Sequence, residues 1–245
     1  MDELRNISRP AVDMQNVAFS FGSDAGSFEL TLDCLKISIG ETVFLAGASG
    51  SGKSTLLGLI CGTLVPREGV INILGTAINS LSGSGRDQFR ADHTGIMFQM
   101  FNLLPYLSIL DNVLLPLHFS KTRKAAAIKN SNNITSEACR LLTALGVDPE
   151  EFGHQKTRDL SVGQQQRVAA ARAFIGSPEI IIADEPTSSL DEDNQAKFME
   201  LLFAEKQRTD ACLIMVSHDM RLATHFGRVI QLQDICSTRS GKLMS

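Results

Sequence analysis

Residues 47–54 read GASGSGKS and match the pattern G-x-x-x-x-G-K-[ST], where a short apolar run gives way to a helix-forming run. Its glycines let the backbone curl so that successive N–H groups form a nest for an anion, and the helix start adds its positive end. A glycine-rich turn with an exposed lysine is the alternative, but the flanking runs favour a nucleoside triphosphate site. The residues expected to bind this ligand are Gly47, Ala48, Ser49, Gly50, Ser51, Gly52, Lys53, Ser54 and Thr55.

Two further features of this loop bear on its chemistry. Lys53 can reach the β- and γ-phosphates, and the Ser54 hydroxyl can ligate Mg²⁺.

A carboxylate pair agrees with this interpretation, because Asp184 and Glu185 end the apolar run IIIADE, where ligands of open α/β sheets collect. Asp184 suits an outer ligand of Mg²⁺, and Glu185 suits the base that orients or deprotonates an attacking water. The alternative is that the pair caps the next helix, and the two roles are compatible.

The stretch LSVGQQQRVAAARAF, residues 160–174, turns from a polar, glycine-containing step into a helix-forming run. Ser161 and Gln164 fit a capping box, S-x-x-Q, which fixes the start of a helix. The pattern alone leaves open whether Ser161 only caps the helix or whether the helix also points its N-terminus at an anion.

Composition limits the class of protein. The chain has 245 residues, of which 43% are hydrophobic and 20% charged, as expected of one large α/β domain or a domain with a lobe. A net charge of −4 argues mildly against a nucleic-acid partner. Five scattered cysteines without a CxxC pair indicate buried free thiols in a reducing compartment. The sequence shows neither a secretory leader nor a run of membrane-spanning length, which predicts a cytosolic protein.

The order of patterns predicts an α/β fold. AVDMQNVAFSF and FELTLDCLKISI alternate apolar and polar residues, as in two antiparallel strands joined by the turn GSDAGS. STLLGLICGTL predicts a helix stopped by Pro66, before the strand VINILG. Helical patterns dominate from about Ser108 to Gly176, and EIIIADE and CLIMVSHD resemble buried parallel strands separated by a helix. We therefore expect a parallel-sheet core, an N-terminal antiparallel β subdomain and an inserted helical lobe.

Taken together, GASGSGKST, LSVGQQQRVAAARA, IIIADEPTSSLD and MVSHD resemble the ATP-binding-cassette (ABC) ATPases, in their order and approximate spacing. The similarity runs from about Val12 to Ile235. It implies a P-loop NTPase with a RecA-like core, one nucleotide-binding domain over residues 10–240 and a helical lobe at about 100–175. It also implies that the chain binds and hydrolyses ATP with Mg²⁺.

In that family the segment after the helical lobe is the signature motif, usually LSGGQ, which completes the ATP site of the opposite subunit. The resemblance implies that Ser161, Gly163 and Gln164 face a γ-phosphate across the interface of a head-to-tail homodimer. Val162 stands where glycine is common, and a β-branched residue at positive φ would be strained. We therefore predict that Val162 has a negative φ and that the motif remains competent.

Other positions match the family one by one. Gln99 resembles the Q-loop glutamine, which senses Mg²⁺ and water, and His218 resembles the switch histidine, which contacts the γ-phosphate. Ser189 and Asp191 resemble the D-loop that passes between subunits. Phe21 resembles the aromatic residue that stacks on adenine, with Phe19 and Phe28 as rivals. Each residue alone also fits an ordinary role, such as a turn amide, a helix cap or a core side chain.

A narrower similarity, in FQMFNLLPYLSILDNVLLPL, QQQRVAAARAF and ADEPTSSLD, is to the subgroup of lipoprotein-releasing, macrolide-exporting and cell-division ATPases. The resemblance implies a peripheral protein on the cytoplasmic side of the membrane, with a few-span membrane subunit as its partner. Residues 101–107 are then a candidate lining for the groove that receives the partner's helix, with ordinary lobe core as the alternative. A soluble cassette ATPase acting on ribosomes or DNA, and a regulatory ATPase of the division machinery, are the competing functions.

Overall fold

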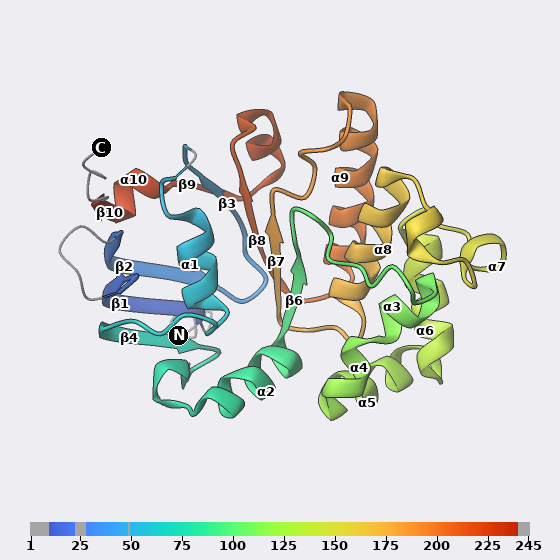
Figure 1. Cartoon of the computed structure of the whole chain (residues 1–245), viewed down its shortest axis with the longest axis horizontal. Helices are drawn as coiled ribbons and strands as arrows, with labels where there is room; N and C mark the ends of the chain where they lie inside the picture. Colours follow the sequence, from blue (N-terminus) through green and yellow to red (C-terminus); the bar gives the residue numbers. More distant parts are fainter. Residues whose placement is uncertain (1–9, 23–27, 49, 240–245) are drawn as a thin grey trace, which may run out of the picture. The chain divides into compact units, whose positions relative to one another are not determined.

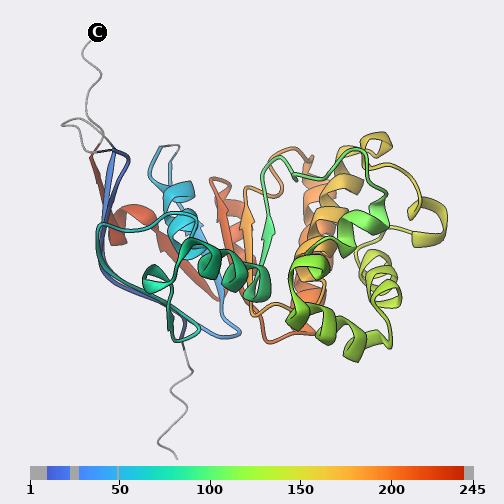
Figure 2. The same ribbon diagram turned by 60° about the horizontal axis from the view of Figure 1, so that its bottom comes forward.

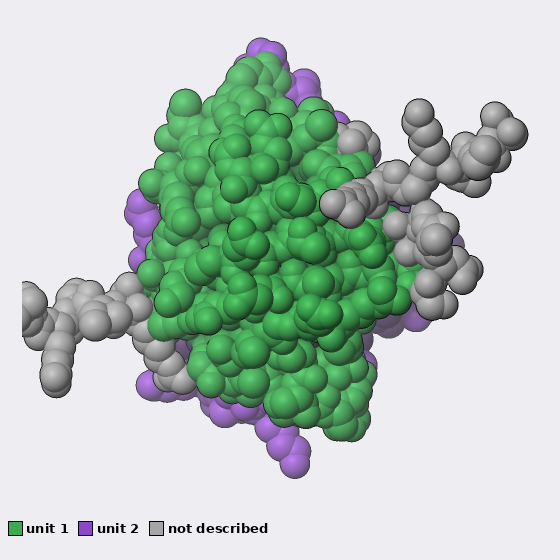
Figure 3. Space-filling model, turned by 90° about the vertical axis from the view of Figure 1, so that its left-hand side faces the viewer, with its two compact units in different colours: residues 1–87, 216–245 green, residues 88–215 purple. Residues whose placement is uncertain are grey.

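The structure is a computed structural model that describes residues 10–22, 28–48 and 50–239 (Figure 1). The chain divides into two compact units, residues 1–87 with 216–245 and residues 88–215, which Figure 3 colours separately. Two elements, α2 (Gly83–His93) and β8 (Cys212–Ser217), cross the boundaries between these units. Ser49 and most of the predicted turn at residues 22–27 lie outside the described residues.

An antiparallel sheet forms much of the first unit. Its strands are β1 (Pro10–Ser20), β2 (Glu29–Ser38), β4 (Glu68–Ile73), β5 (Thr76–Ala77) and β10 (Cys236–Arg239), in the order β10-β2-β1-β4-β5. The predicted pair is confirmed, because β1 lies antiparallel to β2 with Val17 opposite Leu32. Buried and exposed residues alternate along most of both strands, with breaks at Gln15–Asn16 and Asp33–Cys34, which explains why the apolar and polar residues alternate.

The first unit also holds a parallel pair of strands, β3 (Thr42–Ala46) and β9 (Arg228–Gln231), with Val43 opposite Arg228. Helix α1 (Lys53–Ile60) follows β3 and packs beside β4. The prediction that this helix continues to Pro66 is wrong, because Gly62 takes a left-handed conformation, with a φ of 66°, and ends it earlier. Short helical turns, η1 (Ile78–Ser80), η3 (Met220–His225) and α10 (Leu232–Ile235), complete the unit.

In the second unit, β6 (Thr94–Met97), β7 (Ile180–Asp184) and β8 lie side by side. β6 and β7 run parallel with Met97 opposite Ala183, and the predicted buried strand IIIAD is confirmed as β7. Helix α8 (Val162–Phe174) packs on β6, and α9 (Glu192–Gln207) packs beside α8. Neither α2 nor β6 was predicted from the sequence pattern, because α2 has no buried residue and β6 is only four residues long.

Six helical segments form the lobe beside α8 (Figures 1 and 2). They are α3 (Ile109–Leu114), α4 (Pro116–Phe119), α5 (Lys121–Ser131), α6 (Ile134–Ala144), α7 (Pro149–Phe152) and η2 (Thr157–Asp159). Two of them, α3 and α6, pack on α8 itself. Side chains of Ser108, Ser120, Asn133 and Asp148 cap the starts of α3, α5, α6 and α7. Within the described ranges, the structure has no helix with the length and apolar character needed to cross a bilayer.

Arg123 fastens α5 to the end of α8. Its side chain is 2% exposed, and its guanidinium donates to the carbonyl oxygens of Ile175 at 2.5 and 2.8 Å, of Ala173 at 2.9 Å and of Thr94 at 3.2 Å. Carbonyls in the last turn of a helix lack intrahelical partners, so these donors satisfy groups that burial would leave unpaired. Burial lowers the pKa of Arg123 to about 10, so the side chain stays charged at neutral pH.

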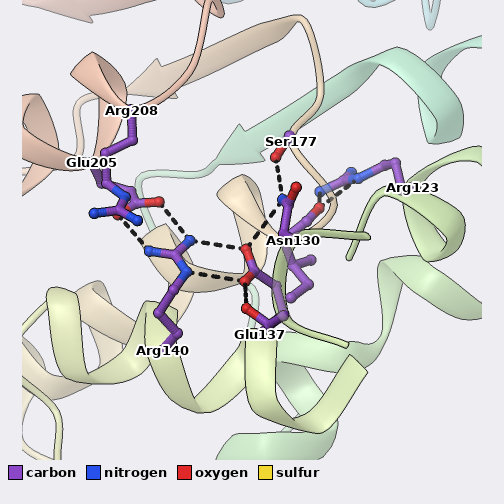
Figure 4. Close-up of polar contacts among 9 residues, drawn as sticks. Arg123, Asn130, Glu137, Arg140, Ser177, Glu205 and Arg208 are labelled. Atoms are coloured by element: carbon purple, nitrogen blue, oxygen red, sulfur yellow. Dashed lines mark hydrogen bonds and ion pairs between the residues drawn. The ribbon is translucent and has the colours of Figure 1, made fainter. Parts of the chain in front are cut away.

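A second polar cluster joins α6 to α9 (Figure 4). Arg140 donates to Glu137 at 2.9 and 3.0 Å and to Glu205 at 2.8 and 3.0 Å, and both carboxylates are buried. Ser131 donates a hydrogen bond of 2.5 Å to Glu137. Burial alone raises the pKa of Glu137, but the hydrogen bonds from Arg140 and Ser131 outweigh it and leave this pKa below its ordinary value.

This cluster predicts a pH-dependent contribution to stability. Because the folded-state pKa of Glu137 is lowered, its contribution is present above the ordinary value of 4.5 and is lost as the pH falls through the folded pKa. We expect the difference in unfolding free energy between the wild type and Glu137→Gln to shrink on acidification, as measured by urea denaturation across a pH series. Glu151→Gln, at an exposed position of α7, is the matched control. A pH-independent difference for Glu137→Gln would contradict the assignment.

Candidate functional site

The predicted segment connects β3 to α1 in the first unit: residues 47–52 lie between the two elements, and Lys53 and Ser54 are the first two residues of α1. Gly52 stands at the N-cap of α1 with a φ of 95°, a conformation that L side chains rarely adopt. Gly50 is also left-handed, with a φ of 78°, and a Cβ on Gly47 would lie 2.5 Å from the Ser51 hydroxyl oxygen, so that hydroxyl would have to rotate away. The glycine spacing therefore matches what this backbone path requires.

Lys53 lies across this loop. Its ammonium donates to the carbonyl oxygens of Gly47 at 2.7 Å and Ala48 at 2.9 Å. Ser54 is exposed, whereas Thr55 is buried. The loop thus presents a cationic group and an exposed hydroxyl from the first turn of a helix, a donor set that suits phosphate and a hard cation.

His218 faces the same loop. A hollow of about 290 Å³ is lined by Ala46, Gly47, Ala48, Ser51, His218, Met220, Gln231 and Gln233. This P-loop hollow brings His218 to the loop that begins at Gly47, although the two are about 170 residues apart in the sequence. Both were predicted to contact the same phosphate. Met220, Gln231 and Gln233 were not predicted, and their sequence context gives no signal for them.

The three candidate aromatic residues differ in exposure. Phe19 is buried in the sheet, which removes it as an adenine-stacking residue, whereas the Phe21 side chain is 52% exposed. Phe21 and Phe28 lie with ring centroids 6.1 Å apart, and the Phe28 ring edge is 3.4 Å from where a Cβ on Gly52 would stand. Both Phe21 and Phe28 remain candidates for the adenine base.

In the second unit, Gln99, Asp184 and Glu185 lie near the C-terminal ends of β6 and β7. Because Met97 pairs with Ala183 in parallel register, Phe98 lies level with Asp184, and Gln99 and Glu185 follow one residue later. The backbone of Glu185 is left-handed, with a φ of 47°, which is uncommon for a non-glycine residue. Amide and carboxylate oxygens are ligands that Mg²⁺ accepts, so Gln99 and Asp184 fit that ion.

The capping box at the start of α8 is confirmed. The Ser161 hydroxyl accepts from the Gln164 N–H at 3.3 Å, and the Gln164 side chain accepts from the Ser161 N–H at 3.0 Å. Val162 is the first residue of α8 and lies outside the set of residues with positive φ, so the prediction for its backbone is confirmed. Its side chain is 46% exposed, which leaves the helix start open to a ligand.

A hollow of about 540 Å³ adjoins this helix start and is called the signature hollow below. It is lined by Gly146, Ser161, Val162, Gly163, Gln164, Arg167, Ser189, Leu190, Asp191 and Asn194. Ser189 and Asp191 were predicted to pass between subunits, and Asp191 also caps α9 by accepting from the Asn194 N–H at 2.8 Å. Gly146, Arg167 and Asn194 were missed, although Arg167 follows Gln164 by one helical turn and this spacing could have indicated it.

Comparison with known proteins agrees with this geometry. The family model for ABC transporters matches residues 33–188. An uncharacterized ABC transporter ATP-binding protein of Mycobacterium tuberculosis is 37% identical over 230 residues, covering 92% of this chain and 88% of the relative. The lipoprotein-releasing system ATP-binding protein LolD of Syntrophotalea carbinolica is 36% identical over 224 residues, covering 91% of this chain and 95% of the relative.

Solved structures show the same fold. An ATP-binding cassette described as a dimer in a post-hydrolysis state, bound to ADP and phosphate, superposes with a TM-score of 0.77 at 35% identity. The superposition covers 94% of this chain and 99% of the other. The expected P-loop NTPase fold, with its antiparallel sheet and helical lobe, is thereby confirmed. With its motifs and family match, the chain belongs to the ABC transporter family, as an ATP-binding subunit that hydrolyses ATP.

Proposed function

We propose that two copies of this chain pair head to tail, with each ATP between residues 47–54 of one copy and residues 161–164 of the other. The observation that supports this most is the signature hollow, where the start of α8 and the residues before α9 line one open space. A capped helix N-terminus attracts an anion, and the γ-phosphate of ATP supplies one. ATP then joins the copies, and hydrolysis removes the bridge.

The proposed roles divide between phosphate binding and hydrolysis. The loop N–H groups and Lys53 bind the β- and γ-phosphates, and His218 contacts the γ-phosphate. Ser54, Asp184 and Gln99 hold Mg²⁺, which neutralises charge on the β- and γ-phosphates when bound. Glu185 orients or deprotonates the attacking water, and Phe21 stacks on adenine. Residues 10–240 then act as one nucleotide-binding domain with a helical lobe at about 100–175.

We further propose that the dimer works on the cytoplasmic side of a membrane, through an integral membrane subunit. The name of the lipoprotein-releasing relative supports this assignment. Exposed apolar side chains beside Gln99 offer a surface for a partner helix: Met100 is 80% exposed and Tyr106 is 68% exposed. Phe101 belongs to the lobe core instead, because it is buried.

The membrane partner is tested by affinity capture from detergent-solubilised native membranes, with Glu185→Gln loaded with Mg-ATP and nucleotide-free protein as the control. We expect ATP-dependent recovery of a membrane protein with few spans and a large outer domain, identified by mass spectrometry. Recovery of ribosomal or DNA-repair proteins without any membrane protein would overturn the proposal.

Val162 gives a second test at the signature motif. Val162→Gly is expected to change the ATPase rate by less than about threefold, because the backbone N–H groups of the α8 start already have helical geometry in the wild type. Steady-state hydrolysis of the two proteins at saturating ATP provides the comparison. A gain of tenfold or more in the glycine variant would mean that valine obstructs the motif.

A further inference from the structure

The turn that carries Gln99 has a defined backbone path. The N–H of Phe101 donates to the carbonyl oxygen of Phe98 at 2.9 Å, which makes Gln99 and Met100 the two central residues of a tight turn. The N–H of Asn102 then donates to the carbonyl oxygen of Met100 at 2.6 Å, which adds a three-residue turn centred on Phe101. The position of Gln99 therefore depends on the conformation of the next three residues.

Two of these residues have a backbone conformation that is uncommon for residues other than glycine. Phe101 has a φ of 57° and Asn102 a φ of 49°, so two successive non-glycine residues are left-handed. Asparagine tolerates this region, but a bulky residue such as phenylalanine rarely adopts it. Such a pair persists only where surrounding contacts hold it in place.

Arg172 supplies those contacts. Its Nη1 donates to the carbonyl oxygen of Asn102 at 2.6 Å and its Nη2 to that of Phe101 at 2.5 Å, one bond to each left-handed residue. The Arg172 side chain is 9% exposed, so water competes little for these carbonyls. A planar guanidinium makes two such bonds in a fixed geometry, whereas a lysine ammonium cannot reproduce the fork.

The same helix carries the signature motif at its other end. Helix α8 begins directly after Ser161, and Arg172 lies in its last turn. Beyond the turn, the buried Asn112 side chain accepts from the Leu104 N–H at 2.8 Å and donates to the Leu104 carbonyl at 3.0 Å. The segment from Gln99 to Leu104 is thus fixed to α8 by Arg172 and to α3 by Asn112.

We infer that Arg172 is a positioning residue for Gln99: by holding the carbonyls of Phe101 and Asn102, it makes the Gln99 turn move with the helix that carries Ser161. The inference rests on the proposed role of Gln99 at Mg²⁺ and the attacking water. Displacement of α8 by a γ-phosphate at its N-terminus then shifts Gln99 as well. Arg172 itself touches neither nucleotide nor metal in this assignment.

The test is a double-mutant cycle between Gln99 and Arg172. Arg172→Lys is expected to lower kcat about tenfold and to raise the Mg²⁺ concentration needed for half-maximal rate, while the KM for ATP changes less than about twofold. In a Gln99→Ala background the same substitution is expected to have little further effect. Additive losses, or an unchanged kcat in Arg172→Lys, would overturn the inference. Arg158→Lys, at an exposed position, is the control.

Variants on the loop side keep the inference testable if Arg172→Lys does not fold. Asn102 is exposed, so substitutions there leave the core intact. Asn102→Gly accepts the left-handed conformation and is expected to keep the wild-type kcat and to restore part of it in Arg172→Lys. Asn102→Val resists that conformation and is expected to reproduce the loss. Equal kcat values for the two Asn102 variants would contradict the inference.

The outcomes also separate this inference from the proposed function. If Gln99→Ala alone leaves kcat and the Mg²⁺ dependence unchanged, the proposed role of Gln99 is wrong. If Gln99→Ala lowers kcat but Arg172→Lys and Asn102→Val do not, the role of Gln99 stands and the positioning role of Arg172 is wrong.

Discussion

Glu185→Gln is expected to lower the rate of ATP hydrolysis by about two orders of magnitude or more, which corresponds to roughly 3 kcal/mol of activation barrier. An amide has nearly the shape of the carboxylate, but it cannot accept a proton from the attacking water. The backbone of Glu185 is left-handed and directly follows β7, so the glutamine side chain should occupy the same place. ATP binding should therefore persist, and the ATP-bound pair of chains should accumulate.

The measurement is steady-state phosphate release together with ATP affinity by equilibrium binding. Glu200→Gln, on an exposed face of α9, is the matched control and should keep the wild-type rate. A turnover near wild type in Glu185→Gln would show that another group activates the water. A loss of ATP affinity would show that the substitution disturbs binding rather than chemistry.

Arg123→Met is expected to lower the free energy of unfolding by about 3–5 kcal/mol, because three buried carbonyls each lose a donor at about 1–3 kcal/mol apiece, while removal of the buried charge offsets part of that loss. Methionine has a similar length but donates no hydrogen bond, so the carbonyls of Ala173, Ile175 and Thr94 lose their buried donor. Arg123→Lys should recover only part of the loss, because one ammonium cannot serve carbonyls at the end of α8 and on β6 together.

Urea denaturation followed by circular dichroism gives this difference, with equal m-values as the check that the unfolded states are comparable. Lys124→Met is the matched control, because Lys124 is the next residue of α5 and is exposed. We expect the control to change stability by less than about 0.5 kcal/mol. A loss below about 1 kcal/mol for Arg123→Met would mean that water replaces its hydrogen bonds at little cost.

Features set by nearby residues were predictable from the sequence. The glycines at 47 and 52 follow from a backbone that must curl within six residues, and the capping box needs only Ser161 and Gln164, three residues apart. The buried strand β7 follows from a continuous apolar run. The negative φ of Val162 follows from its branched side chain.

Features set by distant partners were not predictable. Arg123 bonds to carbonyls 29 to 52 residues away, and Arg172 bonds to carbonyls 70 and 71 residues away. In the sequence alone, each of these arginines resembles a solvent-exposed residue of a helix. The left-handed Phe101 is equally hidden, because a residue that opposes its own backbone preference is held by tertiary contacts that no local pattern encodes. The pairing of β10 with β2 likewise joins strands about 200 residues apart.

The mass of Glu185→Gln in solution shows whether two copies of the chain pair head to tail around ATP. Sedimentation equilibrium should give the single-chain mass of 26.6 kDa without nucleotide and with ADP. With saturating Mg-ATP the mass should double, because the γ-phosphate joins residues 47–54 of one copy to the α8 start of the other. A mass that remains at 26.6 kDa while ATP is demonstrably bound would contradict head-to-tail pairing.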